Sequence, residues 1–252
     1  MADLEVEDLG LRFGGLIVLD AVSFAVERSE LFALIGPNGA GKTSVLNCIS
    51  GIHRAAGRVR FHGQDIANRP PADMSRLGIA RTFQHVELFS HMSVLDNIMT
   101  GRHIRFGTHP LQEALFLPKV RREEVRQRQA VETVIEFLEL EAVRDQQAGV
   151  LPYGIQKMVG LARALALDPT LLLLDEPSAG LTRDERDDLA RFILRIKYQL
   201  KLPMIWIEHD MQMVADLADR IHVLNYGRTL AVGQPAEVLS DPRVVSAYLG
   251  RG

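Results

Sequence analysis

Hydrophobic and polar positions predict short strands at the start of the chain and helices in its middle. Apolar or alternating runs bounded by turn residues predict strands over residues 4–11, 23–26, 31–35 and 58–62. From Ser93 to about Leu167 the pattern becomes helical. The clearest helix is expected over 119–140, where apolar side chains recur at helical spacing at Val131, Val134, Ile135 and Leu138.

After this helical block, strands and helices alternate. The apolar runs predict strands over 171–174, 204–207 and 221–224, and the segments between them predict helices over 183–200 and 211–218. A last helix is expected with Asp241 as its N-cap and Pro242 at its first position. Such alternation indicates a mostly parallel sheet that carries its ligand-binding loops at the strand ends.

Composition and charge place the chain among soluble globular proteins. It has 252 residues, of which 47% are hydrophobic and 24% charged, so one sizeable core needs no disulfide. The net charge of −3 argues against a broad nucleic-acid-binding surface. No apolar run approaches the roughly eighteen residues of a membrane-spanning helix, and the N-terminus does not resemble a signal peptide. Any role at a membrane is therefore expected to need a partner. The single cysteine, Cys48, is expected to be a small buried hydrophobe.

A phosphate-binding loop follows the predicted strand over 31–35. Residues 36–43 read Gly-Pro-Asn-Gly-Ala-Gly-Lys-Thr, which matches G-x-x-x-x-G-K-[ST] at every constrained position. The glycines let the backbone aim successive N–H groups at phosphate oxygens, and the helix that follows adds the positive end of its dipole. Lys42 can reach the β- and γ-phosphates, and the Thr43 hydroxyl can bind Mg²⁺. The sequence therefore predicts a nucleoside triphosphate site.

A second phosphate-site element is the strand over 171–174, which ends in two acids, Asp175 and Glu176. A carboxylate at the mouth of a parallel sheet can hold Mg²⁺, and we assign this role to Asp175. Glu176 lies one position further and can face the attacking water as the general base. An exposed acidic turn would be the simpler interpretation if the chain had no phosphate loop.

Residues 151–165 read Leu-Pro-Tyr-Gly-Ile-Gln-Lys-Met-Val-Gly-Leu-Ala-Arg-Ala-Leu. This segment resembles the signature of ATP-binding cassette (ABC) ATPases, which runs Leu-Ser-Gly-Gly-Gln and precedes a helix ending in Ala-Arg-Ala-Leu. Further elements similar to that family occur in the same order, namely Phe13, Gln84, Ser178 to Leu181 and His209. The match is partial at the front of the signature and good at its end.

The resemblance implies a role for each matching residue. Gln84 would contact Mg²⁺ or the attacking water, and His209 would hydrogen-bond the γ-phosphate. Adenine would stack on Phe13, for which packing in the core is the alternative. The residues expected around ATP are Phe13, Gly36, Asn38, Gly39, Ala40, Gly41, Lys42, Thr43, Ser44 and Asp175. Mg²⁺ would be bound by Thr43, Gln84 and Asp175, and the catalytic residues would be Glu176, His209 and Gln84.

The fold implied by the resemblance is a single α/β domain with a P-loop NTPase core and a mostly parallel sheet. An antiparallel β subdomain would lie at the N-terminus and an α-helical subdomain would be inserted. Residues 1–92 and 166–252 would form the nucleotide-binding core with the β subdomain, and residues 93–165 the helical subdomain with the signature.

Softer features are similar to one subgroup, the ATPase subunits of branched-chain amino acid importers. These features are the Tyr-Gly variant of the signature, the long segment over 101–128 and the ending over 233–250. The resemblance implies a peripheral position on the cytoplasmic face of the cell membrane. The implied partners are transmembrane permease subunits, a second identical or different ATPase subunit and, indirectly, a periplasmic or extracellular binding protein. The signature residues facing the partner's nucleotide would be Tyr153, Gly154, Ile155 and Gln156.

Four positions depart from the family pattern, one of which is Tyr153, which replaces a glycine of the signature. Pro152 replaces the signature serine, so the hydroxyl expected to face the partner's γ-phosphate is missing. The amides of Gly154 and Ile155 would remain as anion contacts, and we expect a weaker but functional contact between subunits. Lys157 stands for an arginine and Gly160 for an acidic residue.

Two other functions remain open at this level. One is an ATPase for lipid or lipopolysaccharide export, and the other is a soluble cassette protein that acts on nucleic acid or ribosomes. The long segment over 101–128 favours the importer, and a single cassette without a coiled-coil insertion argues against the soluble protein. The region of Phe89, Met92, Val94 and Leu95 is a candidate surface for permease docking, with packing in the core as the alternative.

Overall fold

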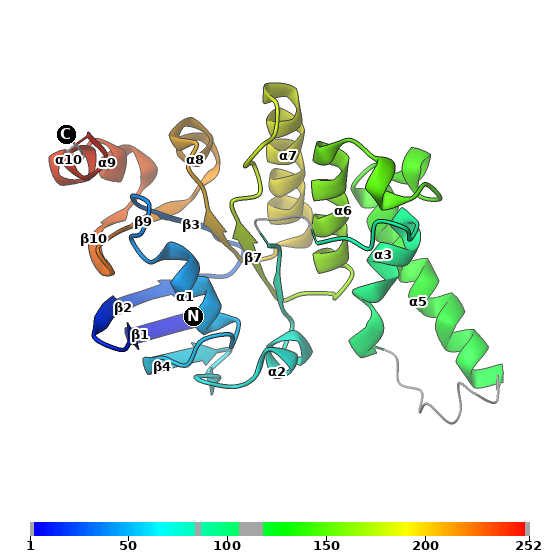
Figure 1. The fold of residues 1–252 in the computed structure, drawn as a ribbon, viewed down its shortest axis with the longest axis horizontal. Helices are drawn as coiled ribbons and strands as arrows, with labels where there is room; N and C mark the ends of the chain where they lie inside the picture. Colours follow the sequence, from blue (N-terminus) through cyan, green and yellow to red (C-terminus); the bar gives the residue numbers. More distant parts are fainter. Residues whose placement is uncertain (1–2, 84–86, 106–117, 250–252) are drawn as a thin grey trace.

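A computed structural model describes residues 3–83, 87–105 and 118–249. In this part of the chain, two sheets are assembled from segments distant in sequence (Figure 1). The antiparallel N-terminal sheet has the order β2-β1-β4-β5, formed by Leu16–Val26, Leu4–Phe13, Ala56–Phe61 and Gln64–Asp65. The central sheet has the order β10-β9-β3-β8-β7-β6, formed by Arg228–Gly233, Arg220–Asn225, Leu31–Ile35, Met204–Ile207, Leu171–Asp175 and Ile79–Arg81.

The central sheet is parallel from β6 to β9, and only its edge strand β10 is antiparallel. Parallel strands need crossover connections, and the described helices supply many of them. Their bounds are α1 Lys42–Ile49, α2 Pro71–Arg76, α3 Val94–Thr100, α5 Pro118–Phe137, α6 Tyr153–Leu165, α7 Arg183–Arg195, α8 Met211–Leu217, α9 Pro235–Leu239 and α10 Pro242–Leu249. Short 3₁₀ segments cover His103–Arg105, Glu141–Val143 and Ala148–Val150, and a π-helical turn covers Ile196–Leu200.

Both faces of the central sheet are buried, because side chains of each strand alternate between two cores. In β3, Leu31, Ala33 and Ile35 join the core beneath α3, α6 and α7, whereas Phe32 and Leu34 join the core shared with α1 and the N-terminal sheet. This two-sided burial explains why the central strands read as continuous apolar runs in the sequence. Because β3, β8 and β7 are paired in parallel, their carboxyl ends lie side by side at the same end of the sheet.

A helical unit stands beside the central sheet. Figure 1 shows α3, α5 and α6 together on the right, with α7 between them and the sheet. The apolar stripe of α5 packs inward, since Val131 and Ile135 are fully buried and Leu138 nearly so. None of the helices in the described ranges is long and apolar enough to cross a lipid bilayer.

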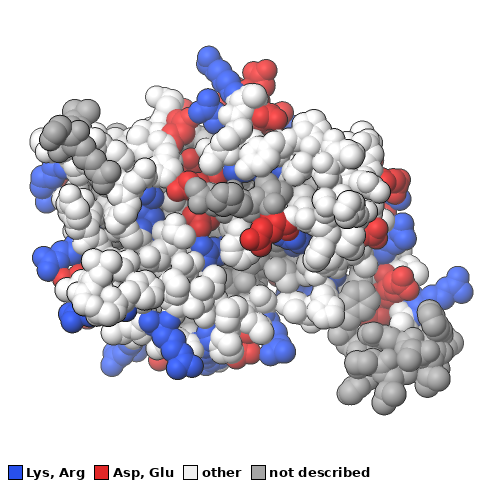
Figure 2. Space-filling model, in the orientation of Figure 1, with Lys and Arg blue, Asp and Glu red and all other residues white. Residues whose placement is uncertain are grey.

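Charged side chains of both signs lie on the face drawn in Figure 2. On the face drawn in Figure 2, Lys and Arg lie mostly around the outline of the molecule, and several Asp and Glu gather in its upper middle. The described residues form no continuous basic patch on that face.

The structure confirms the predicted α/β class but changes several elements. The helix predicted over 119–140 is α5, which ends at Phe137. Beyond its end, Glu139 adopts a left-handed conformation with φ of 58°. The helix predicted over 183–200 changes to a π-helical turn after Arg195. Strand β2 begins at Leu16 rather than at residue 23, with Leu16 and Ile17 exposed, which hides the usual alternation. Strands β5, β6 and β10 and helices α2 and α9 were not predicted, because β5, β6, α2 and α9 are short and β10 is an edge strand without a buried apolar run.

Candidate active site

The phosphate loop connects β3 to α1 and has a conformation that requires glycine at several positions. Gly36, Gly39 and Gly41 have φ of 149°, 81° and 102°. A Cβ atom at position 36 would also overlap the carbonyl oxygen of Leu224 in β9. Because Gly41, the residue before α1, has no side chain to cap the helix, the first N–H groups of α1 are left for an anion.

Lys42 is the first residue of α1 and is only 6% exposed. Its Nζ atom donates to the carbonyl oxygens of Gly36 (2.7 Å) and Pro37 (3.2 Å), so the ammonium group lies inside the loop. Burial lowers the pKa of Lys42, and the nearby carboxylates of Glu176 and Asp175 act in the opposite direction. The structure thus brings the phosphate loop and the acidic strand end together. Thr43 is exposed, Ser44 is half-buried, Ala40 is buried and Asn38 is exposed at the loop tip.

Asp175, the last residue of β7, is 3% exposed and is held by an arginine. Its Oδ2 atom accepts a hydrogen bond from Arg81 (2.7 Å), which also donates to Asn47 of α1 (2.7 Å) and to Ser50, the residue after α1 (3.0 Å). The other carboxylate oxygen, Oδ1, has no hydrogen-bond partner among the described residues. A buried carboxylate oxygen left unpaired beside a phosphate loop has the chemistry of a hard-cation ligand, so this donor set fits Mg²⁺.

Glu176 and His209 form a direct pair across the site. The His209 Nε2 atom lies 2.7 Å from Glu176 Oε1, although the residues are 33 positions apart. They meet because β7 and β8 are neighbouring parallel strands, with Asp175 in register with Ile207. Glu176 itself has a left-handed backbone with φ of 48°, and its N–H donates to the Ile207 carbonyl (3.0 Å). From the sequence we expected separate roles for these two side chains and did not predict that they form a hydrogen bond.

Gln84 lies outside the described residues, and its contact with metal or water stays a prediction. The residues before it leave β6 beside β7, where the Thr82 N–H donates to the Leu173 carbonyl oxygen (2.9 Å). The last residue of β6 is Arg81, which donates to the carboxylate of Asp175.

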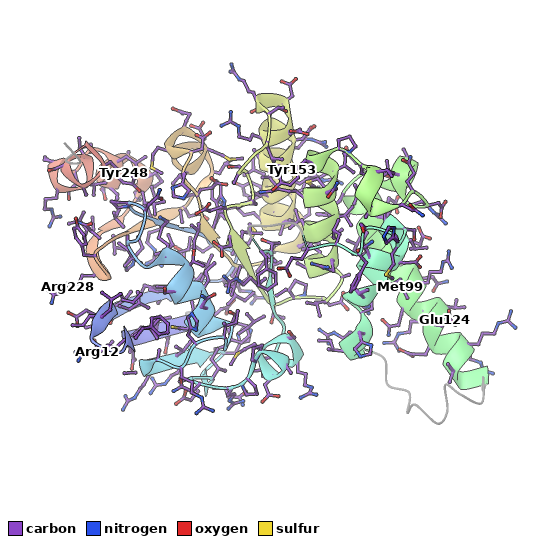
Figure 3. All side chains as sticks on the ribbon, viewed as in Figure 1. Arg12, Met99, Glu124, Tyr153, Arg228 and Tyr248 are labelled. Atoms are coloured by element: carbon purple, nitrogen blue, oxygen red, sulfur yellow. The ribbon has the colours of Figure 1, made fainter. Side chains whose placement is uncertain are left out.

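The signature segment forms the start of α6. Pro152 occupies the N-cap position with an extended backbone, and Tyr153 follows with 44% of its surface exposed. Figure 3 shows Tyr153 at the end of α6 that lies beside α7. Gly154 is buried, and Ile155 and Gln156 are half-buried, with the Gln156 amide donating to the Leu151 carbonyl oxygen (2.9 Å).

The Gly154 amide already faces a carboxylate of its own chain. A Cβ atom at position 154 would overlap the carboxylate of Glu185. Hydrogen bonds from the backbone and side chain of Thr182, and a smaller one from the Gly154 amide, lower the pKa of Glu185. An anion therefore occupies the N-terminus of α6, at the place where the sequence predicted a phosphate contact.

Two family models match the chain. One described as "ABC transporter" covers residues 19–179, which include the phosphate loop, the signature and the acidic strand end. The chain belongs to the ABC transporter family. A second model, described as "Branched-chain amino acid ATP-binding cassette transporter", matches residues 228–252, which include β10, α9 and α10.

Relatives of this ABC chain match it over nearly its whole length. It is 39% identical over 251 residues to the high-affinity branched-chain amino acid transport ATP-binding protein BraF of Pseudomonas aeruginosa, covering 98% of this chain and 97% of BraF. It is 37% identical over 248 residues to LivG of Escherichia coli, a protein of the same description, covering 98% and 97%. A crystal structure of MJ1267 in its ADP conformation, an ATP-binding cassette of an ABC transporter, superposes with a TM-score of 0.87 at 34% identity and covers 100% of both chains. These similarities confirm that the ABC chain is an ATP-binding ATPase subunit of a transporter.

The candidate adenine contact is available at the surface of this ABC chain. Phe13 lies at the end of β1 and is 51% exposed, with its ring 5.2 Å from the His53 ring in an edge-on contact. Its exposure excludes the alternative that Phe13 is a core residue. Stacking on adenine stays a prediction.

The surface predicted for permease docking is smaller in the structure than in the sequence. Val94 and Leu95 are core residues, with 0% and 5% exposure, so the docking prediction is wrong for these two. Helix α3 begins at Val94 and turns both side chains toward α5 and α6. Phe89 is 56% exposed and Met92 is half-buried.

The contacts of several residues that support the site were not predicted from the sequence. Arg81 donates to the carboxylate of Asp175, and Lys157 donates to the backbone carbonyl of Glu176. Glu208 accepts from the backbone N–H of Ser178. Tyr248 of α10 approaches the start of the phosphate loop, where the Gly36 amide partly offsets the effect of burial, which raises the pKa of the phenol to about 12. No local motif marks these residues, because their partners lie on other elements.

Proposed function

We propose that this chain is the ATP-hydrolysing subunit of an importer for branched-chain amino acids. The observation that carries this proposal is the similarity over nearly the full length to BraF and LivG, together with the separate match of residues 228–252 to a branched-chain amino acid model. These matches favour import over the export and nucleic-acid alternatives. The chain would lie on the cytoplasmic face of the membrane, attached through permease subunits.

ATP would bind with its phosphates against the loop amides and the Lys42 ammonium. Lys42 is already held inside the loop by two carbonyl oxygens, so little ordering is needed when the phosphates arrive. Mg²⁺ would be held by the Thr43 hydroxyl, Asp175 and Gln84, and it would neutralise charge on the phosphate oxygens. The unpaired Oδ1 atom of Asp175 supports this assignment.

Glu176 would act as the general base toward water, with His209 as its partner. His209 Nε2 can donate to Glu176 Oε1 while the carboxylate is ionised, which holds the acid in one orientation. When the γ-phosphate is present, the same imidazole can turn its donor toward a phosphate oxygen. This exchange would free Glu176 to accept the proton of water.

The site would be completed by a second cassette. Tyr153, Gly154, Ile155 and Gln156 would face the nucleotide bound to the partner subunit, and the partner's signature would face this chain's phosphate loop. Closure would displace Glu185 from the Gly154 amide, because two anions cannot share that position at low cost.

An apolar groove is our candidate surface for the permease. It has a volume of about 420 Å³ and lies between the nucleotide core and the helical unit. Its lining includes the exposed side chains Ile52, Phe83 and Ile104. Since it contacts both β6 and α6, an apolar helix seated there could follow movements of the signature relative to the core.

Reconstitution with the native permease subunits and candidate binding proteins tests this function. Binding protein loaded with leucine, isoleucine or valine should stimulate ATP hydrolysis, whereas the same preparation loaded with urea or an aliphatic amide should not. Stimulation by another solute class alone would contradict the proposed cargo. Vesicles that expel a lipid substrate on ATP addition would favour the exporter instead.

A further inference from the structure

The turn that carries Glu176 is held from one side by a lysine of the signature helix. Lys157 lies one turn into α6, and its Nζ atom donates to the carbonyl oxygens of Glu176 (3.2 Å) and Pro177 (3.1 Å). The ammonium group also lies 5.5 Å from the centre of the Tyr153 ring. Lys157 thus connects the signature helix to the backbone of the acidic turn in the same subunit.

The same turn is held from the other side by a buried carboxylate. Glu208 is 2% exposed, and each of its oxygens accepts a backbone hydrogen bond. Oε1 accepts from the Ser178 N–H (3.0 Å), and Oε2 accepts from the His209 N–H (2.9 Å). One carboxylate therefore joins the turn after β7 to the loop after β8. Charge-assisted bonds of this kind are stronger than those between neutral groups.

The opposite charges of Lys157 and Glu208 stabilise each other. Burial lowers the pKa of Lys157, and the carboxylates of Glu208 and Glu176 oppose that effect. Glu208 is thus buried near a positive charge, although its direct partners are amides. Removing either group leaves the other in a low-dielectric region with less compensation.

The backbone between these contacts needs support. Glu176 has φ of 48°, a conformation that costs a residue with a side chain free energy unless its surroundings impose it. Lys157 binds the carbonyl of this residue and Glu208 binds the amide two positions later. Both contacts therefore act on the segment that aims the Glu176 carboxylate at His209.

We propose that Lys157 and Glu208 are positioning residues for ATP hydrolysis, which hold Glu176 and His209 at hydrogen-bond distance. Because Lys157 belongs to α6, a movement of the signature helix would shift the turn that carries Glu176 and so change the distance between Glu176 and His209 of the same subunit. This inference rests on the proposed catalytic roles of Glu176 and His209.

The test compares Glu208→Gln and Lys157→Met with matched variants elsewhere. Gln keeps the shape of Glu208, but its NH₂ group cannot accept from an amide, so either Ser178 or His209 loses its acceptor. Glu30→Gln and Lys197→Met are the controls, because Glu30 also accepts a backbone N–H and the buried Lys197 also donates to an oxygen, that of Asp219, both outside the site. Lys157→Arg restores the positive charge and its donors.

Two measurements are made on the full chain. We expect kcat for ATP to fall about tenfold or more in Glu208→Gln and Lys157→Met, since small misplacements of reacting groups can cost up to about 10²-fold. The KM for ATP should stay within about twofold, and Lys157→Arg should recover most of the activity. Amide hydrogen exchange in nucleotide-free protein should accelerate over residues 176–181 in both variants and not in the controls.

Unchanged exchange over 176–181 would show that the two side chains do not hold the turn, and faster exchange with unchanged kcat would show that the hold is merely structural. Either result overturns the inference. A rise in the KM for ATP as large as the fall in kcat would also overturn the inference, because such a rise would indicate a role in ATP binding. Failure of the proposed function is separate, since it would appear as normal turnover in Glu176→Gln whatever the exchange rates.

Discussion

Two adjacent carboxylates at the end of β7 have different surroundings and therefore different chemistry. Asp175 still belongs to the strand and is tied to α1 through Arg81, which leaves it buried with one carboxylate oxygen unpaired. At Glu176 the backbone turns to a positive φ, and the side chain is directed at His209. A single change of backbone conformation thus separates the metal-ligand role proposed for Asp175 from the base role proposed for Glu176.

Replacement of Glu176 by Gln tests the base role at the residue scale. Gln keeps the size of the side chain but cannot accept the proton of water, so ATP should still bind while kcat falls by about a hundredfold or more. Binding of labelled ATP and release of phosphate measure the two effects. Glu237→Gln on α9, an exposed position, is the control and should leave both unchanged. Near-normal turnover in Glu176→Gln would contradict the assignment.

At the scale of elements, helix α6 presents its N-terminus with fewer donors than the family pattern. Pro152 has neither hydroxyl nor N–H, and the Gly154 amide faces Glu185 from the capping box of α7. The signature helix is therefore tied to α7 within one subunit before a second cassette approaches. In the proposed dimer, closing would have to replace that contact with a phosphate.

Substitution of Pro152 by Ser should strengthen ATP-driven dimerisation. The new hydroxyl can donate to the partner's γ-phosphate, and one such bond contributes on the order of 1 kcal/mol, or about fivefold in affinity. Pro152→Ala is the matched control, because it removes the ring without adding a donor. Analytical ultracentrifugation of Glu176→Gln chains with ATP measures the affinity. Equal affinities for the Ser and Ala variants would refute a missing hydroxyl as the cause of weak closure.

At the scale of the whole molecule, the two sheets meet at a buried histidine. His222 in β9 is fully buried, and its ring packs against Phe24 of β2 and Phe32 of β3. Its Nε2 atom lies 3.0 Å from the Thr229 hydroxyl, and Nδ1 has no partner among the described residues. Burial, and to a smaller extent the Arg220 charge, lower the pKa of His222 from 6.5 to about 4. The imidazole is therefore neutral in the folded protein at physiological pH.

This histidine should make the fold sensitive to acid. Between pH 6.5 and about 4 the unfolded chain binds a proton at His222 that the folded chain excludes, so the free energy of unfolding falls as pH falls through this window. The full effect is about 3 kcal/mol and is absent above pH 6.5. Urea unfolding at pH 7 and pH 4.5 should show a smaller pH-dependent loss in His222→Leu than in the parent. Identical losses in both proteins would rule out His222 as the cause.

The sequence by itself determined the features that depend on contiguous residues. Residues 36–43 carry their own turn-forming glycines and their own lysine, so their function follows from local backbone conformation. The apolar runs ending at Ile35 and Leu174 predicted buried parallel strands, because such strands are covered on both faces. The order of motifs along the chain was enough to indicate the family.

Only the tertiary structure decided which distant side chains meet. The pairing of Glu176 with His209 and the bridge through Glu208 depend on β7 and β8 lying side by side, a neighbour relation that no local pattern encodes. The burial of Val94 and Leu95, the exposure of Phe13 and the placement of Glu185 against Gly154 were likewise settled by packing. The physical reason is that local sequence sets backbone conformation and periodicity, whereas strand order and helix packing choose the partner of each polar group.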